Sequence, residues 1–307
     1  MAVGCPVLIK ASGVQIVKTK IFYFSGTGNS FILARDIAAR LNAEMISIPK
    51  VIHDEKIYVD AQRMGVVFPS YLAALFGVPL MVEKFIEKIT NLRELDIFAV
   101  CNSGGYESMN ALPPLYRLQD IIRKRGGHLG AGFTVRLPMN NLDYDHIPVP
   151  IERDTGLIVV RSRRRVDAIC SRILQGKGTS FKIPKAVLNR LMAMGYGLMH
   201  KPVLDSLKRN AGVPLDSTLG FWELIPMTDN GIQVNDNCIG CGTCQMVCPA
   251  KNIRLKDGKP EFLHTCEMCF ACDEWCPRGA IQHWGRAEGI KYHHPDAKLK
   301  DMLAGRQ

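Results

Sequence analysis

The stretch CIGCGTCQMVCP, residues 238–249, carries four cysteines and a proline at fixed intervals. Two residues separate each of the first three cysteines, and the fourth follows after three more, directly before the proline. The stretch CEMCFACDEWCP, residues 266–277, repeats this spacing with an offset of 28 residues. Closely spaced cysteines of this kind indicate a metal site. The two runs therefore raise the question of what they bind, and what the rest of the chain adds to it.

The repeat continues beyond the cysteines. PAKNI (249–253) matches PRGAI (277–281), and between the runs lies IRLKDGKPEFL (253–263). The Asp-Gly pair in this segment predicts a β-hairpin with a tight turn. The sequence thus predicts a small α+β domain made of two similar halves.

Each run follows Cys-x2-Cys-x2-Cys-x3-Cys-Pro and resembles the bacterial 2[4Fe-4S] ferredoxin family over about residues 230–290. In that family the fourth cysteine of each run ligates the cluster of the other run. The resemblance implies one [4Fe-4S] cluster on Cys238, Cys241, Cys244 and Cys276, and a second on Cys266, Cys269, Cys272 and Cys248. Zinc is the alternative, but a zinc site needs its own four ligands and has no use for interleaved runs.

The chain has 307 residues, of which 47% are hydrophobic, and is long enough for two domains. No apolar run approaches the ~18 residues that span a bilayer, so we expect no transmembrane segment. The N-terminus lacks the basic region and cleavage site of a signal peptide, which predicts a cytoplasmic protein. The remaining cysteines, Cys5, Cys101 and Cys170, are scattered, and we expect them to be small buried hydrophobic residues.

The formal charge of +10 is concentrated in one segment, because residues 151–220 hold 13 Lys and Arg against 5 Asp and Glu. Bound iron–sulfur clusters, with their cysteine thiolates, would offset part of this charge. The segment lacks the interleaved aromatic residues of single-strand binding proteins. We therefore expect no nucleic-acid partner.

A second motif lies near the N-terminus, in TKIFYFSGTGNSFILARDIAARLNA (19–43). It predicts a strand, a loop of small residues and an amphipathic helix. In such a loop the backbone amides can converge on an anion at the helix N-terminus. The loop residues are Ser25, Gly26, Thr27, Gly28, Asn29 and Ser30.

Two other nucleotide-binding motifs do not fit this loop. The third glycine position of a dinucleotide fingerprint is Phe31, and the strand that follows lacks the acid that binds ribose. No Gly-Lys-Ser/Thr follows, which excludes a P-loop. A hydroxyl-rich loop without lysine fits a phosphate monoester such as that of FMN.

The loop resembles the phosphate loop of the flavodoxin family. This resemblance implies that two further loops, each after a buried strand, contact the flavin ring of FMN. The first would supply Pro69, Ser70 and Tyr71, and the second Asn102, Ser103, Gly104, Gly105 and Tyr106. Tyr71 has an alternative interpretation as an ordinary core aromatic residue.

The predicted fold is α/β, with three parts. Residues 1–177 would form a flavodoxin-like, doubly wound, five-stranded parallel sheet in the order 2-1-3-4-5, closed by a helix at 161–177. Residues 178–220 would form a helical linker, with one or two helices over 183–212. Residues 221–307 would form the small 2[4Fe-4S] ferredoxin-like domain and a C-terminal tail, in which we expect His293 and His294 to be exposed.

The whole chain resembles flavodoxin–ferredoxin fusion proteins, also called the EFR1 family. The resemblance implies an electron-transfer protein that passes low-potential electrons between two [4Fe-4S] clusters and FMN in anaerobic redox metabolism, with other redox proteins as donor or acceptor. The alternative is an FMN-dependent reductase that acts on its own small-molecule substrate and draws electrons from the ferredoxin domain. No catalytic acid–base pair is evident. The apolar linker predicts a clamp between the domains, and a homodimer with cofactors paired between subunits is left open.

Overall fold

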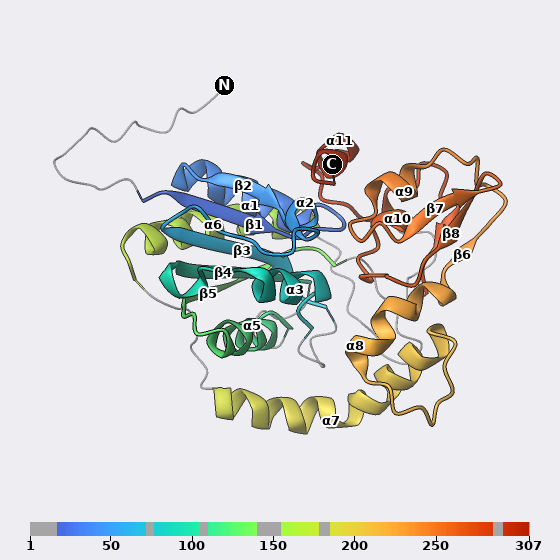
Figure 1. Cartoon of the computed structure of the whole chain (residues 1–307), viewed down its shortest axis with the longest axis horizontal. Helices are drawn as coiled ribbons and strands as arrows, with labels where there is room; N and C mark the ends of the chain where they lie inside the picture. The colour runs from blue at the N-terminus through green and yellow to red at the C-terminus, as the bar shows by residue number, and fades with distance from the viewer. Residues whose placement is uncertain are drawn as a thin grey trace.

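The computed structural model describes residues 17–71, 77–104, 110–139, 155–177, 185–284 and 291–306, apart from the side chains of 186, 189 and 191–199. Figure 1 shows an N-terminal sheet domain, a C-terminal domain beside it and a long helix that runs along both. Within these ranges no helix is both long and apolar enough to cross a bilayer.

The N-terminal domain is built on five parallel strands. They are β1 (Thr19–Tyr23), β2 (Glu44–Ser47), β3 (Arg63–Pro69), β4 (Asp96–Ser103) and β5 (Leu129–Arg136). Their order is β2-β1-β3-β4-β5, which confirms the predicted topology. The central strands β3 and β4 are buried almost throughout, because helices cover both faces of a parallel sheet.

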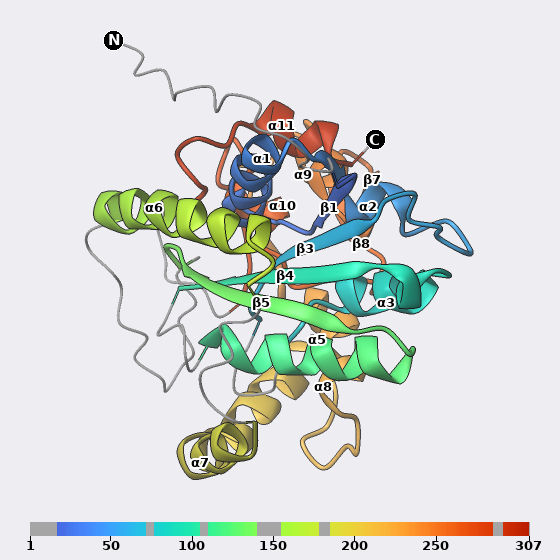
Figure 2. The ribbon, with the colours of Figure 1, turned by 90° about the vertical axis from the view of Figure 1, so that its left-hand side faces the viewer.

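Helices α1 (Asn29–Leu41) and α6 (Thr155–Leu174) cover one face of the sheet, and α3 (Leu80–Lys88) and α5 (Leu112–Lys124) cover the other (Figure 2). The short segments α2 (Ile48–Val51) and η2 (Leu92–Glu94) complete this domain. Helix α6 begins six residues earlier than the predicted 161, because Ile158 and Val159 are also buried.

One helix, α7 (Lys185–Asn210), forms the linker and contains Pro202 within it. At its start, Lys185 forms an ion pair with Asp120 of α5. Near its end, Val203 and Leu207 are buried in an apolar cluster that includes Phe270 of the C-terminal domain. The linker thus contacts both domains.

The C-terminal domain contains nine short elements in its described residues. They are α8 (Phe221–Leu224), η3 (Ile225–Gly231), β6 (Gln233–Val234), α9 (Thr243–Val247), β7 (Ile253–Lys256), β8 (Lys259–Phe262), α10 (Ala271–Glu274), β9 (Ile281–Gln282) and α11 (Leu299–Ala304). Strands β7 and β8 form the predicted hairpin. Asp257 and Gly258 at its turn have φ of 51° and 75°, as the tight turn requires.

Residues 291–306, here called the C-terminal strap, return to the N-terminal domain. Ala297 and Met302 of the strap are buried in the same apolar cluster as the core of the sheet. The expectation of an exposed histidine pair is wrong for His294, which is only 1% exposed. His294 is buried because its backbone amide donates to the carbonyl of Thr27 at 2.9 Å and draws the residue against the N-terminal domain. His293 is exposed, and its ring stacks on Trp275 at 4.3 Å.

The packing of the sheet predicts a strong effect of one glycine substitution. A Cβ at Gly65 of β3 would lie 2.4 Å from the ring of Phe98, which is buried. We expect Gly65→Ala to destabilise the N-terminal domain by about 1–3 kcal/mol through overpacking, measured by urea denaturation. The matched control is Gly130→Ala in β5, where the nearest atom is 3.5 Å away. Equal stability of the two variants would contradict this packing.

Candidate functional site

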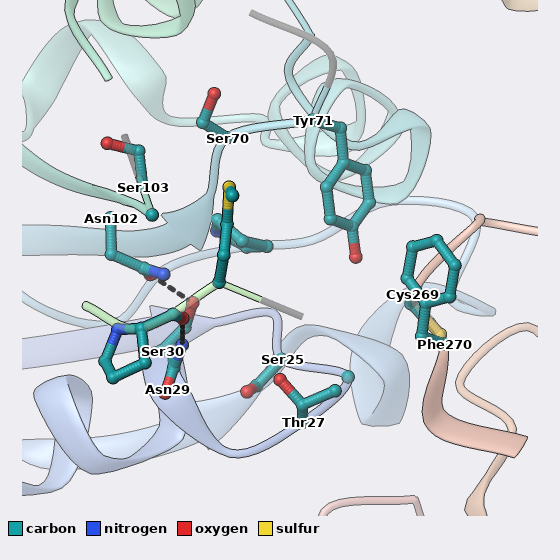
Figure 3. A pocket seen from close by; sticks show the side chains of 15 residues that line it. Ser25, Thr27, Asn29, Ser30, Ser70, Tyr71, Asn102, Ser103, Cys269 and Phe270 are labelled. Atoms are coloured by element: carbon teal, nitrogen blue, oxygen red, sulfur yellow. Dashed lines mark hydrogen bonds between the residues drawn. The ribbon is translucent and has the colours of Figure 1, made fainter. Parts of the chain in front are cut away.

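A cavity lies at the carboxyl ends of β1, β3 and β4, between the two domains (Figure 3). Parallel α/β sheets bind ligands at this edge. The N-terminal domain lines the cavity with the following residues: Ser25, Gly26, Thr27, Asn29, Ser30, Pro69, Ser70, Tyr71, Asn102, Ser103, Gly104, Pro138 and Met139. The C-terminal domain adds Cys269 and Phe270.

Residues 25–30, here called the phosphate loop, are held by short polar contacts. The backbone amide of Gly28 donates to Ser25 Oγ at 3.1 Å, and Gly28 has a φ of 97° that suits glycine. Ser30 Oγ donates to Asn102 Oδ1 at 2.6 Å, as Figure 3 shows. Asn29 Nδ2 donates to the Pro138 carbonyl at 2.9 Å. The phosphate loop and the predicted second loop thus meet at one site.

Four hydrogen bonds reach the other side of the phosphate loop from the C-terminal domain and the strap. Arg306 donates to the carbonyl of Ser25 at 2.6 Å, and the indole of Trp275 donates to that of Gly26 at 3.0 Å. The backbone amide of His294 donates to the carbonyl of Thr27, as described above. The hydroxyl of Tyr292 donates to Asn29 Oδ1 at 2.9 Å.

The phosphate loop also touches the backbone of a cysteine from the second run. A Cβ at Gly26 would lie only 2.0 Å from the carbonyl oxygen of Cys269, so only glycine fits this approach. Nearby, the buried carboxylate of Glu267 accepts from the amide of Met81 at 3.1 Å, and burial raises the pKa of Glu267 to about 7. The second cysteine run therefore lies directly against the N-terminal domain.

Tyr71 and Phe270 lie at one end of the cavity, opposite Asn102 and Ser103 (Figure 3). Burial raises the pKa of the Tyr71 phenol well above its ordinary value, so the hydroxyl remains a neutral donor. The ring of Tyr71 also packs edge-on against Phe24 at 6.3 Å, in line with its interpretation as a core residue. Gly105 and Tyr106 lie outside the described residues.

The eight clustered cysteines gather around two further cavities. Cys238, Cys241, Cys244 and Cys276, here called the outer set, line one cavity. Cys248, Cys266, Cys269 and Cys272, the inner set, line the other. Each set combines three cysteines of one run with the last cysteine of the other.

The two sets have equivalent contacts and different exposure. The amide of Asn252 donates to Cys248 Sγ, and the amide of Ala280 donates to Cys276 Sγ, each at 3.3 Å. These two hydrogen bonds are related by the 28-residue offset of the repeat. Cys241 of the outer set is exposed, whereas Cys269 of the inner set is buried. Burial raises the pKa of Cys269 to about 12, so this thiol stays protonated at neutral pH unless a metal binds it.

The cysteine geometry fits iron–sulfur clusters better than zinc. Zinc needs four sulfurs about 2.3 Å from one point. In the part of the chain that the structure describes, no group of three or more His, Cys, Asp or Glu side chains could hold a single metal ion. Each set is spread around a cavity, as a larger inorganic group requires.

The first cavity fits a flavin mononucleotide. Ser103 Oγ is buried in its wall and finds no hydrogen-bond partner among the described residues. Such a group calls for a ligand or water. The phosphate loop, at the N-terminus of α1, suits a phosphate.

The sequence predicted the cysteine pattern and the loops, but not the residues that join them. Cys101 and Cys170 are buried, as expected, and Cys5 lies outside the described residues. Trp275, Tyr292 and Arg306 were missed as contacts of the phosphate loop. Gly26 and Gly28 could have indicated these contacts, because glycine is also required where another part of the backbone approaches closely.

Comparison with known proteins identifies the C-terminal part. Residues 231–277 match the model of the 4Fe-4S dicluster domain. A polyferredoxin protein, MvhB of Methanothermus fervidus, is 43% identical over 51 residues. That match covers 16% of this chain and 12% of the polyferredoxin, so the chain spans a small part of that relative's length.

Solved structures resemble the chain over about half its length. The Trp repressor binding protein of Bacillus subtilis is 17% identical and covers 51% of this chain and 97% of its own, with a TM-score of 0.35. The flavodoxin of Fusobacterium nucleatum, solved with flavin mononucleotide, is 15% identical and covers 52% and 98%, with a TM-score of 0.34. The observed sheet order and the matched domain together show a flavodoxin-like fold joined to a 4Fe-4S dicluster domain.

The crossed cysteine sets predict selective loss of one cluster. We expect Cys248→Ala to lower the iron content from about eight to about four per chain, because only the inner set loses a ligand. Cys276→Ala should have the same effect through the outer set, and Cys101→Ala should leave iron unchanged. Iron and sulfide analysis after anaerobic reconstitution measures this, with spectroscopy to identify the remaining cluster. Loss of iron in Cys101→Ala would contradict the assignment.

The buried histidine of the strap predicts a pH-dependent contact. Burial lowers the pKa of His294 from 6.5 to about 4. Between pH 4 and pH 6.5 the imidazole of His294 is therefore protonated when the strap is released and neutral when the strap is docked. Docking should therefore be intact above pH 6.5 and weaken toward pH 4, by as much as roughly a hundredfold. Hydrogen exchange of residues 291–306, corrected for intrinsic rates, measures it. His294→Asn keeps an acceptor for the amide of Asp296 and should remove the pH dependence of docking. Equal protection of the wild-type strap at pH 7 and at pH 5 would contradict this prediction.

Proposed function

We propose that this chain is an electron carrier that passes low-potential electrons between two [4Fe-4S] clusters and one FMN, as part of anaerobic redox metabolism. The clusters would supply one-electron transfer, and FMN would supply storage of one or two electrons. The outer and inner cysteine sets would hold the clusters. The phosphate loop and the loops at 69–71 and 102–104 would hold FMN.

The observation that carries this proposal is the shared wall between the two sites. Cys269 belongs to the inner set and also lines the cavity of the phosphate loop. Phe270 lines both cavities as well. No other domain or chain has to bridge the inner cysteine set and the proposed flavin site.

The exposure of the two cysteine sets supports an order of electron transfer through the protein. The outer set contains the exposed Cys241, and the neighbouring Ile239 is 65% exposed. The inner set lies against the N-terminal domain through Cys269 and Gly26. We therefore propose that redox partner proteins exchange electrons at the outer set, and that the inner set connects it to the flavin site.

The alternative, a reductase with its own substrate, depends on what covers the flavin site. Residues 72–76, 105–109 and 140–154 border that site in sequence and lie outside the described residues. A small-molecule substrate therefore stays a prediction.

A mixing experiment tests the single-chain arrangement. Thr27→Glu places a negative charge in the phosphate loop and should abolish FMN retention while the clusters stay intact. Cys248→Ala should disable the inner cluster and keep FMN. We expect no recovery of electron transfer when the two variants are mixed, because the inner set lies beside the phosphate loop of its own chain.

The readout is anaerobic reduction of FMN by electrons delivered to the clusters, followed by absorbance. Thr155→Glu, an exposed threonine at the start of α6, is the matched charge control and should behave as wild type. Recovery of transfer in the mixture would show that the path runs between chains. FMN retained by Thr27→Glu would contradict the assignment of the phosphate loop.

A further inference from the structure

Three consecutive carbonyls of the phosphate loop accept hydrogen bonds from outside the N-terminal domain. Arg306 binds the carbonyl of Ser25, Trp275 that of Gly26, and the backbone amide of His294 that of Thr27. Trp275 lies in the C-terminal domain, and the other two donors lie in the strap. The outward side of the loop is thus fixed by residues more than 240 positions away in sequence.

A peptide unit couples its two polar groups. In a trans peptide the carbonyl of one residue and the amide of the next point in opposite directions. The described residues contain no cis peptide. Fixing the carbonyls of residues 25–27 on one side therefore turns the amides of residues 26–28 to the other side. The amide of Gly28 follows this rule, since it donates to Ser25 Oγ, a residue of the cavity wall.

We propose that Trp275, Arg306 and the His294 amide position the phosphate loop for its anion, so that affinity for the FMN phosphate depends on docking of the C-terminal domain and strap. This inference rests on the proposed function, because it assumes that the cavity binds FMN. The three donors are positioning groups; none of them lines the cavity. Tyr292 adds a fourth contact, through the side chain of Asn29.

The position of Trp275 links this effect to the clusters. Trp275 directly precedes Cys276 of the outer set and follows Cys272 of the inner set by three residues. Its side chain is 8% exposed and is held between the phosphate loop and the ring of His293. The indole that holds the carbonyl of Gly26 thus lies between a cysteine of the inner set and a cysteine of the outer set in sequence.

The test compares two ligands that differ only in the phosphate. Cluster-loaded, flavin-free protein is titrated with FMN and with riboflavin, and binding is followed by flavin fluorescence. Trp275→Phe removes the indole donor and keeps an aromatic ring. We expect its Kd for FMN to rise roughly threefold to tenfold, as the loss of one hydrogen bond implies, and its Kd for riboflavin to stay unchanged.

The chain offers matched controls. Trp284 donates its indole N–H to the carbonyl of Thr228 at 2.9 Å, away from the phosphate loop, so Trp284→Phe removes an equivalent bond. Tyr292→Phe removes only a hydroxyl from the loop contacts, and Tyr58→Phe, at a site 68% exposed, is its control. Both control variants should bind FMN and riboflavin as wild type does.

Each outcome bears on one statement. A selective loss of FMN affinity in Trp275→Phe and Tyr292→Phe supports the positioning role. Equal losses for FMN and riboflavin would show a general packing effect and overturn it, and so would unchanged affinity for both ligands. A wild-type protein that binds no FMN would instead remove the proposed function itself.

Discussion

The close approach of Cys269 to Gly26 is the contact on which the rest of the structure depends. The carbonyl oxygen of a cysteine in the inner set occupies the space where any side chain at position 26 would begin. This contact joins the wall of the proposed cluster site to the wall of the proposed flavin site. Burial reinforces it, because Val247, Ala271 and Trp275 belong to the same apolar cluster as the core of the sheet. The two domains thus share one continuous hydrophobic core.

The linker and the strap connect the two domains on either side of this contact. Helix α7 is tied to α5 through Lys185 and is buried against the C-terminal domain through Val203 and Leu207. The strap closes the other side, where Arg306 donates to the carbonyls of both Ser25 and Val247, one in each domain. A flexible tether would leave the distance between the sites undefined. The linker and the strap instead connect the two domains at both sides of this contact.

The sequence was most informative where local spacing determines chemistry. The cysteine runs and the Asp-Gly hairpin follow from intervals in the sequence, and the strand order follows from the flavodoxin-like pattern of strands and helices; the structure has all three. The interface could not be predicted, because nothing local shows that Trp275 reaches Gly26 across 249 positions. His294 was misjudged for the same reason. It lies in a polar segment, and its burial comes only from the tertiary contact with Thr27.

The central claim is that one chain contains a complete path between the inner cysteine set and the flavin site. The most direct measurement is the rate of internal electron transfer after a light flash reduces the flavin of the fully loaded protein under anaerobic conditions. The account predicts a first-order rate that is independent of protein concentration, because the two sites share a wall. A rate that rises in proportion to protein concentration, or no transfer to the clusters, would contradict it.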